Sequence, residues 1–213
     1  MMPNRHIALA GAIALITPLL LAPAYAADVA TSDAPVLTRT TKAAAKDSAA
    51  DVWSHTDETG YQFYGALPRV DVRRATAEHT SRKAVFTMSF ADLVKGGHQT
   101  FVVQIRTKKM VRFVGVYAYP GNDKGMVFLR KRDDSDLVPK GIEHRIDYAK
   151  DKVRVVVPRK RLGTPAWFRV AMFNMAWADG SSVSYQDNPH HDRQLGQQEW
   201  LDGPPLSMKI YPG

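Results

Sequence analysis

The sequence of 213 residues contains no cysteine. This absence excludes disulfide-stapled scaffolds, cysteine-ligated zinc, iron–sulfur clusters, thiol nucleophiles and thiol-linked lipid anchors. After the N-terminal segment, no apolar run reaches the roughly 20 residues that a membrane-spanning helix needs. The remaining composition, with 45% hydrophobic and 23% charged residues, is typical of an ordinary globular protein.

The first 26 residues have the pattern of a secretory signal peptide. A basic residue lies near the start, residues 7–21 are apolar, and Ala24-Tyr25-Ala26 has the small-x-small form of a cleavage site. The alternative is an uncleaved membrane anchor, which two prolines in and after the apolar stretch disfavour because they interrupt a helix. We therefore expect cleavage between Ala26 and Ala27 and release of a secreted, extracellular protein without further membrane association.

The expected mature chain divides into a leader and one domain. Residues 27–50 are rich in alanine and small polar residues and contain no aromatic side chain, so they bury too little apolar surface to offset the entropy of ordering. We predict a flexible leader there, with a helical turn over 41–50 as the alternative. Aromatic residues begin after residue 50, and we place a single domain at 51–213.

The domain is dominated by alternation of apolar and polar residues with a period of two, which indicates β-strands with one buried face. Eight or nine short strands without long helices predict an all-β fold, a single antiparallel β-sandwich. Two short helical turns interrupt the strands, one within 89–97 and one at 158–162, where Pro158 begins the turn and Gly163 follows it. Strands are expected at 72–79, 84–90, 101–106, 111–119, 126–130, 142–148, 152–157, 167–177 and near 206–210.

Two stretches resemble a group of secreted bacterial β-sandwich proteins. One covers the hairpin of 72–79 and 84–90 with its flanking residues from Asp71 to Leu93, and the other runs from Asp147 to Trp167. The hairpin is also similar in pattern to DOMON-like domains and to family-nine-like carbohydrate-binding modules. The resemblance covers less than half of the mature chain and implies a fold. It carries no catalytic, haem-ligating or other ligand-binding residue over to this sequence.

No motif indicates catalysis. No serine lies in the Gly-x-Ser-x-Gly context of a strained nucleophile turn, and the best-placed carboxylates, Glu143 and Glu199, have no evident second carboxylate for glycoside hydrolysis. We therefore predict a protein that is not an enzyme, and keep a hydrolase of unrecognised type as an alternative.

The sequence predicts neither a cofactor nor a metal. His190, His191 and Asp192 offer three ligand types together, but neighbouring residues of a strand point to opposite faces. In a loop the three side chains can share one ion, so this alternative stays open beside that of a solvated polar loop. The acidic turn at 133–136 follows a basic run, and we interpret it as a partner of that run rather than as a calcium site.

Positive charge is concentrated in residues 104–161, which contain 16 Lys and Arg against 7 Asp and Glu. A basic sheet edge including Arg106, Lys109 and Arg154 would attract an anionic ligand. The alternative, which the sequence favours, is that these charges protect exposed strand edges and maintain solubility. Nucleic acid is not an expected partner, because no nucleic-acid-binding motif is present and the protein is expected to be exported.

Aromatic residues are the candidates for sugar binding, in which a ring stacks on a sugar. Tyr117 and Tyr119 share one face of a strand with Phe113 and Gly115; this face is either an outward platform or, as the sequence favours, part of the core. Trp177 at a strand end and Trp200 in a Gly- and Pro-rich segment are further candidates, whereas Trp167 is expected in the core. The favoured hypothesis is a non-catalytic binder of a carbohydrate or anionic cell-envelope polymer. An inhibitor-like protein-interaction domain is the alternative.

Overall fold

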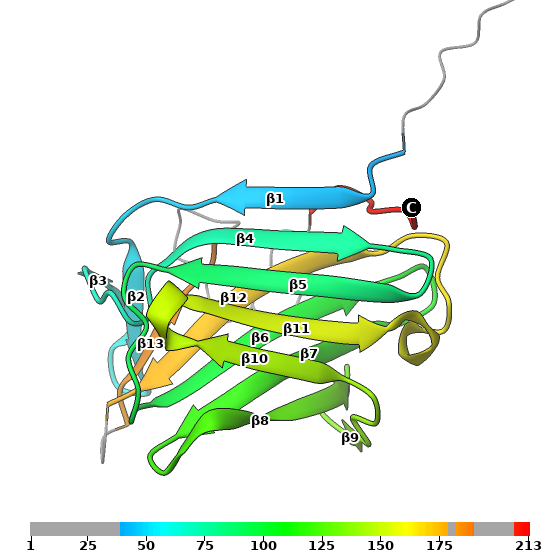
Figure 1. Ribbon diagram of the computed structural model, residues 1–213. Helices are drawn as coiled ribbons and strands as arrows, with labels where there is room; N and C mark the ends of the chain where they lie inside the picture. The colour runs from blue at the N-terminus through cyan, green and yellow to red at the C-terminus, as the bar shows by residue number, and fades with distance from the viewer. Residues whose placement is uncertain (1–38, 179–181, 190–206) are drawn as a thin grey trace, which may run out of the picture. The chain divides into compact units, whose positions relative to one another are not determined.

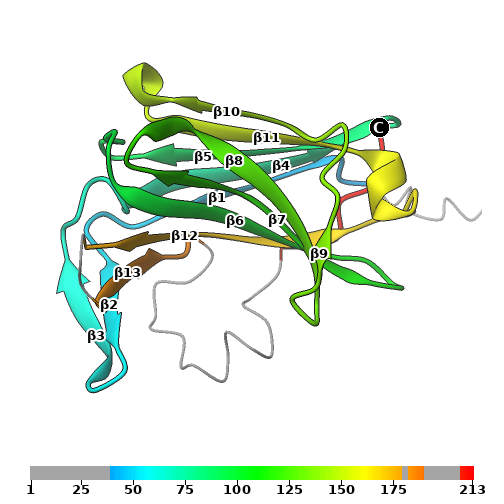
Figure 2. The ribbon, with the colours of Figure 1, turned by 90° about the horizontal axis from the view of Figure 1, so that it is seen from below.

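The computed structural model describes residues 39–178, 182–189 and 207–213, and in these residues the predicted all-β sandwich is confirmed. Two antiparallel sheets face each other (Figure 1), and a view turned by 90° shows them as two layers (Figure 2). The larger sheet extends past the smaller one at one side, through β3 (Gly60–Gly65), β2 (Val52–Thr56) and β13 (Ser184–Asp187) (Figure 2).

The smaller sheet has five strands. It consists of two hairpins of consecutive strands, a pairing between these hairpins that joins distant parts of the chain, and one added edge strand. In spatial order the strands are β1 (Lys42–Lys46), β4 (Val72–His79), β5 (Lys83–Phe90), β11 (Lys152–Pro158) and β10 (Glu143–Asp147).

The larger sheet has eight strands. The long strands β12, β6, β7 and β8 form its centre, and the β2–β3 hairpin joins it through β13. In spatial order the strands are β3 (Gly60–Gly65), β2 (Val52–Thr56), β13 (Ser184–Asp187), β12 (Arg169–Trp177), β6 (His98–Arg106), β7 (Val111–Tyr119), β8 (Asn122–Lys131) and β9 (Asp136–Leu137).

The core lies between the sheets and is formed by alternate residues of the paired strands. On β11, Val153, Val155 and Val157 are buried while Lys152 and Arg154 are exposed, as the alternation predicts. Similar alternation places large side chains of β5, β6 and β12 in the same cluster, which includes Phe86, Met88, Phe101, Ile105 and Met172. Burial of these apolar surfaces is the main driving force that holds the two layers together.

The structure corrects the predicted start of the domain. β1 lies within the segment that was expected to be a flexible leader or a helical turn, and it pairs along its whole length with β4, from Lys42 opposite Glu78 to Lys46 opposite Arg74. Ala43 packs against the core. The alanine-rich sequence has no strand signal of its own, and pairing with the exposed edge of β4 overrides local propensity.

Thirteen strands are present in the described residues, more than the eight or nine predicted. The extra strands are β1, the β2–β3 hairpin, the two-residue β9 and the short β13. Near the C-terminus, the expected last strand is reduced to a single bridge between Phe168 and Ile210.

Of the two predicted helical turns, one is confirmed. η2 (Arg159–Leu162) is a 3₁₀ helix that begins after Pro158 and ends at Gly163, whose left-handed φ of 67° closes the turn. Residues 91–97 form bends instead of a helix. A second 3₁₀ helix, η1 (Tyr148–Lys150), lies between β10 and β11.

Trp167 does not belong to the core, contrary to expectation. Its ring is half-buried with the Lys209 Nζ atom 4.7 Å from the ring centroid, and the neighbouring Phe168 fills the core position instead. None of the helices within the described ranges has the length and hydrophobicity needed to cross a bilayer.

Candidate functional site

The outer face of the larger sheet carries aromatic side chains. On β7, Val114, Val116 and Ala118 are buried in the core, so the alternate residues Phe113, Tyr117 and Tyr119 project from the opposite face. These three rings are half-buried and do not belong to the core cluster. Of the two alternatives left open by the sequence, the structure therefore favours the outward platform.

Neighbouring strands extend this face into a cleft of about 700 Å³. Register pairs Tyr117 with Met126 of β8 and with Thr100 of β6, and Thr100 in turn with Met175 of β12. Paired residues share a face of a sheet, so the cleft crosses four strands. Its walls include Phe113, Tyr117, Met126, Phe128, Met175 and Trp177.

The floor of the cleft depends on Gly115. An added Cβ at this position would lie 2.1 Å from the carbonyl oxygen of Phe101 and 2.6 Å from Cζ of Phe128. The ring of Phe128 therefore lies across β7 where any other residue would place a side chain. The Arg130 guanidinium lies over the same ring, 5.3 Å from its centroid, and its charge is paired with that of Asp136.

One end of the cleft is formed by a cluster of three rings. Nδ1 of His98 lies 2.7 Å from the hydroxyl oxygen of Tyr117. The ring of Tyr119 packs against both, with centroids 5.4 Å from Tyr117 and 6.5 Å from His98. Trp177 pairs with His98 in register, so the structure brings the predicted residues Tyr117, Tyr119 and Trp177 together.

The aromatic face continues onto the β2–β3 hairpin. Gln186 of β13 pairs with both Met175 and Trp53, which places Trp53 on the same face. Trp53 packs edge-on against Phe63 with a centroid distance of 5.4 Å, and the side chain of Phe63 is 61% exposed. The aromatic face therefore extends beyond the cleft to an exposed ring on the hairpin.

A basic depression of about 770 Å³ lies at the other end of the same strands. It lies at the ends of β7 and β8, where Arg112 and Lys131 pair in register and alternate with the outward-facing Phe113 and Arg130, so these two cations project from the opposite face of the sheet to the cleft. The ion pairs found in the described residues involve none of its cations. Its six basic residues are Arg106, Lys108, Lys109, Arg112, Lys131 and Arg132.

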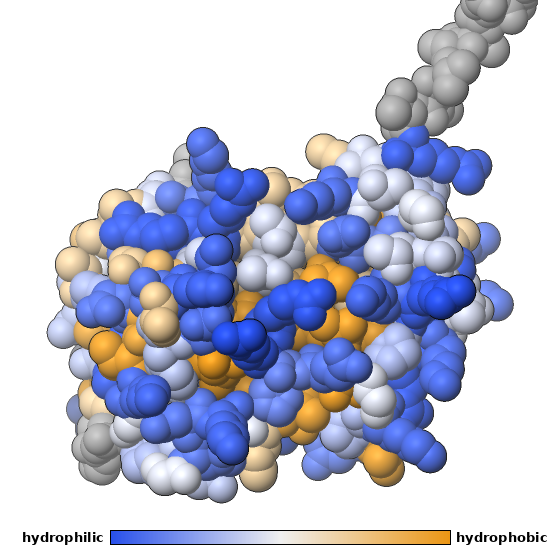
Figure 3. Space-filling view, viewed as in Figure 1, coloured by the Kyte–Doolittle hydropathy of each residue, from blue (hydrophilic) through white to orange (hydrophobic). Residues whose placement is uncertain are grey.

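Arg154 is not part of this depression, which corrects the prediction of one basic sheet edge. The sequence does not show that β11 pairs with β5, and this pairing places Arg154 in the smaller sheet, opposite Thr87 and Arg145. Figure 3 shows the outer face of that sheet, where hydrophilic side chains project over narrower apolar patches. Arg106 and Lys109 are thus together, and Arg154 is separate from them.

Other candidates fall outside the site or outside the described residues. Glu143 is exposed on β10. The acidic turn pairs with the basic run as predicted, since Oδ1 of Asp136 lies 2.9 Å from Nε of Arg130. Trp200, Glu199, His190, His191 and Asp192 lie outside the described residues.

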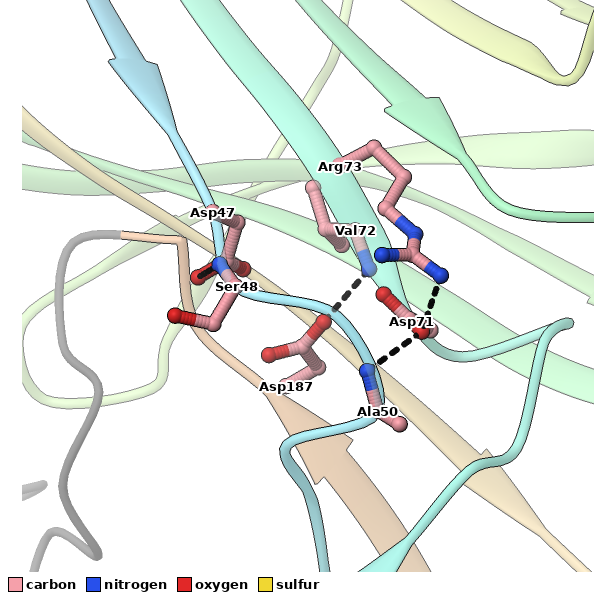
Figure 4. A network of polar contacts seen from close by, with 7 residues as sticks. All are labelled: Asp47, Ser48, Ala50, Asp71, Val72, Arg73 and Asp187. Atoms are coloured by element: carbon pink, nitrogen blue, oxygen red, sulfur yellow. Dashed lines mark hydrogen bonds and ion pairs between the residues drawn. The ribbon is translucent and has the colours of Figure 1, made fainter.

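A second polar site lies where the β1–β2 loop meets the ends of β4 and β13. Ligand oxygens of Asp47, Asp51 and Asp187 lie within 4.8 Å of one another. Figure 4 shows Asp47, Asp71 and Asp187 approaching from three segments of the chain, with the backbone N–H of Val72 donating to Asp187 Oδ2. We name Asp47, Asp51, Asp71 and Asp187 the aspartate cluster.

The electrostatics of the aspartate cluster are those of crowded, buried carboxylates. Burial raises the pKa of Asp187 to about 7 against the lowering effect of the Val72 hydrogen bond, and the nearby Asp51 and Asp71 charges raise this pKa further. Asp71 Oδ2 lies 3.1 Å from Nη2 of Arg73 and accepts a hydrogen bond from the Ala50 backbone N–H at 2.9 Å. A bulge places Arg73 outside the β4–β5 pairing, where its side chain turns back to Asp71.

Sequence reasoning missed the aspartate cluster entirely. Its members are spread over 141 positions, from residue 47 to residue 187, and only the strand pairing brings them together. The available signal was weak: Asp187 is the last residue of an otherwise neutral strand, and Asp71 directly precedes a strand.

No protein-family model, no curated protein and no solved structure matches this chain.

Proposed function

We propose that the protein binds a polysaccharide or another anionic polymer of the cell envelope along the outer face of the larger sheet. The observation that carries this proposal is the aromatic cleft that crosses β12, β6, β7 and β8. Sugar rings have an apolar C–H face that packs on aromatic side chains, while their hydroxyls need polar groups at the margin of the site. The cleft offers both, with Tyr117, Phe128 and Trp177 as rings and Thr100 and Arg130 as polar groups.

The shape of the site suits a chain rather than a small molecule. The cleft, the ring cluster around His98 and the exposed Phe63 lie along one continuous sheet, and the basic depression lies at the ends of two of its strands. A linear polymer can lie along the outer face, contact the rings in succession and reach the cations at the strand ends. The basic depression favours polymers that carry carboxylate, phosphate or sulfate groups, because its cations attract anions over roughly 10 Å at 0.1 M salt.

Co-sedimentation with purified cell walls and insoluble polysaccharides tests the proposal. We expect the protein to sediment with at least one of these materials, and Trp177→Ala to weaken binding by roughly tenfold, since stacked aromatic side chains contribute strongly at binding sites. Tyr64→Ala is the matched control, because Tyr64 is an exposed aromatic residue of β3 that packs on Tyr185, away from the cleft.

Two results would contradict the proposal. Absence of sedimentation with every material would leave the cleft without a polymer ligand and would favour a protein partner. Equal loss in Trp177→Ala and Tyr64→Ala would show that binding does not occur at the cleft.

A further inference from the structure

The aspartate cluster provides the ligand chemistry of a hard divalent cation. Asp47 and Asp51 come from the β1–β2 loop and Asp187 from β13, and each contributes a carboxylate oxygen. Calcium binds six to eight oxygen ligands in proteins, with carboxylates as the usual charged members of the set. An all-oxygen ligand set also disfavours zinc and copper, which prefer nitrogen and sulfur ligands.

The oxygens of the three carboxylates are close enough to share one calcium ion. Calcium–oxygen distances are about 2.3–2.6 Å, so two ligands on opposite sides of one ion are roughly 4.6–5.2 Å apart. The three oxygens lie within 4.8 Å of one another, which allows all of them to contact a single calcium ion. Magnesium binds at about 2.0–2.1 Å and demands near-ideal octahedral geometry, so three carboxylates from separate segments suit it less well than calcium.

Asp71 supports a cation site independently, because one of its carboxylate oxygens is buried without a partner among the described residues. Its side chain is 2% exposed, and while Oδ2 is held by Arg73 and by the Ala50 N–H, Oδ1 is buried without a hydrogen-bond partner in the part of the chain that the structure describes. In Figure 4 this oxygen lies on the side that faces Asp187. Asn174, opposite Asp187 in register, is fully buried and likewise has no described partner for its Oδ1.

We propose that the aspartate cluster binds one calcium ion, with Asp47, Asp51 and Asp187 as ligands. The ion would fasten the β1–β2 loop, which follows β1 of the smaller sheet, to β13 of the larger sheet, and would therefore connect the two sheets at one edge of the sandwich. This inference does not depend on polymer binding at the cleft, which lies on the outer face of the larger sheet.

Calorimetric titration of the chelator-treated full chain with calcium chloride tests the proposal directly. We expect a stoichiometry of one ion per chain and a weaker response to magnesium chloride at the same ionic strength. Because a ligand that binds only the folded state stabilises it, calcium at one hundred times its Kd is expected to raise Tm by roughly 5–10 °C.

Variants assign the ion to the aspartate cluster. Asp51→Asn and Asp187→Asn each remove one charged ligand and are expected to weaken calcium binding at least tenfold and to abolish the shift in Tm. Asp136→Asn is the matched control: it also removes one aspartate charge, but this exposed residue of β9 pairs with Arg130. Far-UV circular dichroism in chelator establishes that each variant is folded, and where one variant fails to fold, the other decides.

The proposal is overturned by either of two outcomes. The first is a wild-type chain that binds no calcium in the titration, a result that needs no variant. The second is calcium binding that both folded site variants retain at the wild-type affinity, which would locate the ion elsewhere.

Discussion

The hydroxyl oxygen of Tyr117 lies 2.7 Å from Nδ1 of His98, and this contact fixes the orientation of a ring on the wall of the cleft. If the ring stacks on a sugar, Tyr117→Ala is expected to weaken polymer binding by roughly tenfold. Tyr117→Phe keeps the ring and loses only the hydrogen bond, so its binding is expected to fall by about threefold or less. Co-sedimentation isotherms of the two variants measure the difference.

Trp167→Ala is a suitable control for the Tyr117 series, because Trp167 is a half-buried ring that contacts Lys209 and does not line the cleft. Binding that is equally weak in Tyr117→Phe and Tyr117→Ala would assign the effect to the hydroxyl and not to the ring.

The basic depression predicts a salt-dependent component of polymer binding. Lys109→Glu and Arg106→Glu reverse charges at its wall and are each expected to weaken binding about two- to fivefold at low ionic strength, with little effect at high salt because exposed charges are screened. Binding isotherms at about 0.02 M and 0.5 M sodium chloride measure this dependence.

Arg154→Glu is the matched charge reversal on the outer face of the smaller sheet. Its isotherm is expected to follow that of the wild type. An Arg154→Glu effect equal to that of Lys109→Glu would mean that only net charge matters, and would contradict a localised anion site.

The faces of the strands were predictable from the sequence, but their partners were not. Alternation on β7 and β11 correctly gives the buried valines, because a period of two is a local property. The pairing of β11 with β5 joins residues more than sixty positions apart, and no local pattern encodes it. This is why Arg154 was expected beside Arg106, although the two residues belong to different sheets.

The aspartate cluster and β1 were missed for the same reason. A lone aspartate in a loop normally indicates a solvated turn, and only long-range pairing makes four of them neighbours. β1 is an alanine-rich segment with good intrinsic helix propensity, and its extended conformation follows from hydrogen bonds to β4.

Gly115 is expected to tolerate no side chain. Gly115→Ala places a methyl group against the Phe101 carbonyl and the Phe128 ring, and overpacking of this kind is expected to lower the free energy of unfolding by roughly 2–4 kcal/mol. Urea denaturation measures this loss. In Gly121→Ala the added methyl group meets nothing within 4 Å, but alanine is strained at the φ of 86° of this position. The free energy of unfolding is therefore expected to fall by only about 1 kcal/mol. Equal losses would rule out steric overlap as the cause.

Asp151 combines a left-handed backbone with a hydrogen bond. Its φ is 51°, and its Oδ1 accepts from the backbone N–H of Leu93 at 2.8 Å. Asparagine at this position keeps an oxygen that accepts the Leu93 hydrogen bond and adopts a left-handed φ at little cost. Glycine adopts this φ but has no acceptor, and alanine has no acceptor and is strained at this φ. Unfolding free energies are therefore expected to fall in the order Asn, Gly, Ala, with about 2 kcal/mol lost in Asp151→Ala. A glycine variant more stable than the asparagine variant would show that the hydrogen bond contributes nothing.

His79 predicts a loss of stability at mildly acidic pH. Its ring is fully buried against Phe168, Nδ1 lies 3.2 Å from the Ile210 carbonyl oxygen, and Nε2 has no hydrogen-bond partner among the residues described. Burial lowers the pKa of His79 below 6.5, against the opposing effect of the Ile210 carbonyl, and the nearby Arg159 charge lowers this pKa further.

The unfolded chain takes up a proton at residue 79 as pH falls below about 6.5, whereas the folded chain does not until a lower pH. The contribution of His79 to the free energy of unfolding is thus fully present above pH 6.5. It is lost as the pH falls toward the pKa of His79 in the folded chain, by no more than about 1.4 kcal/mol per pH unit. Asp187 acts in the opposite direction, because its raised pKa favours the folded state as pH falls from about 7 toward 4. The pH dependence of unfolding must therefore be compared between the wild type and His79→Gln. This variant removes the titration of His79 and keeps that of Asp187. Urea denaturation at about pH 7.5 and 5.5 is expected to show a smaller loss, or a gain, in the variant. An identical pH dependence in both proteins would mean that His79 titrates alike in the folded and unfolded chains.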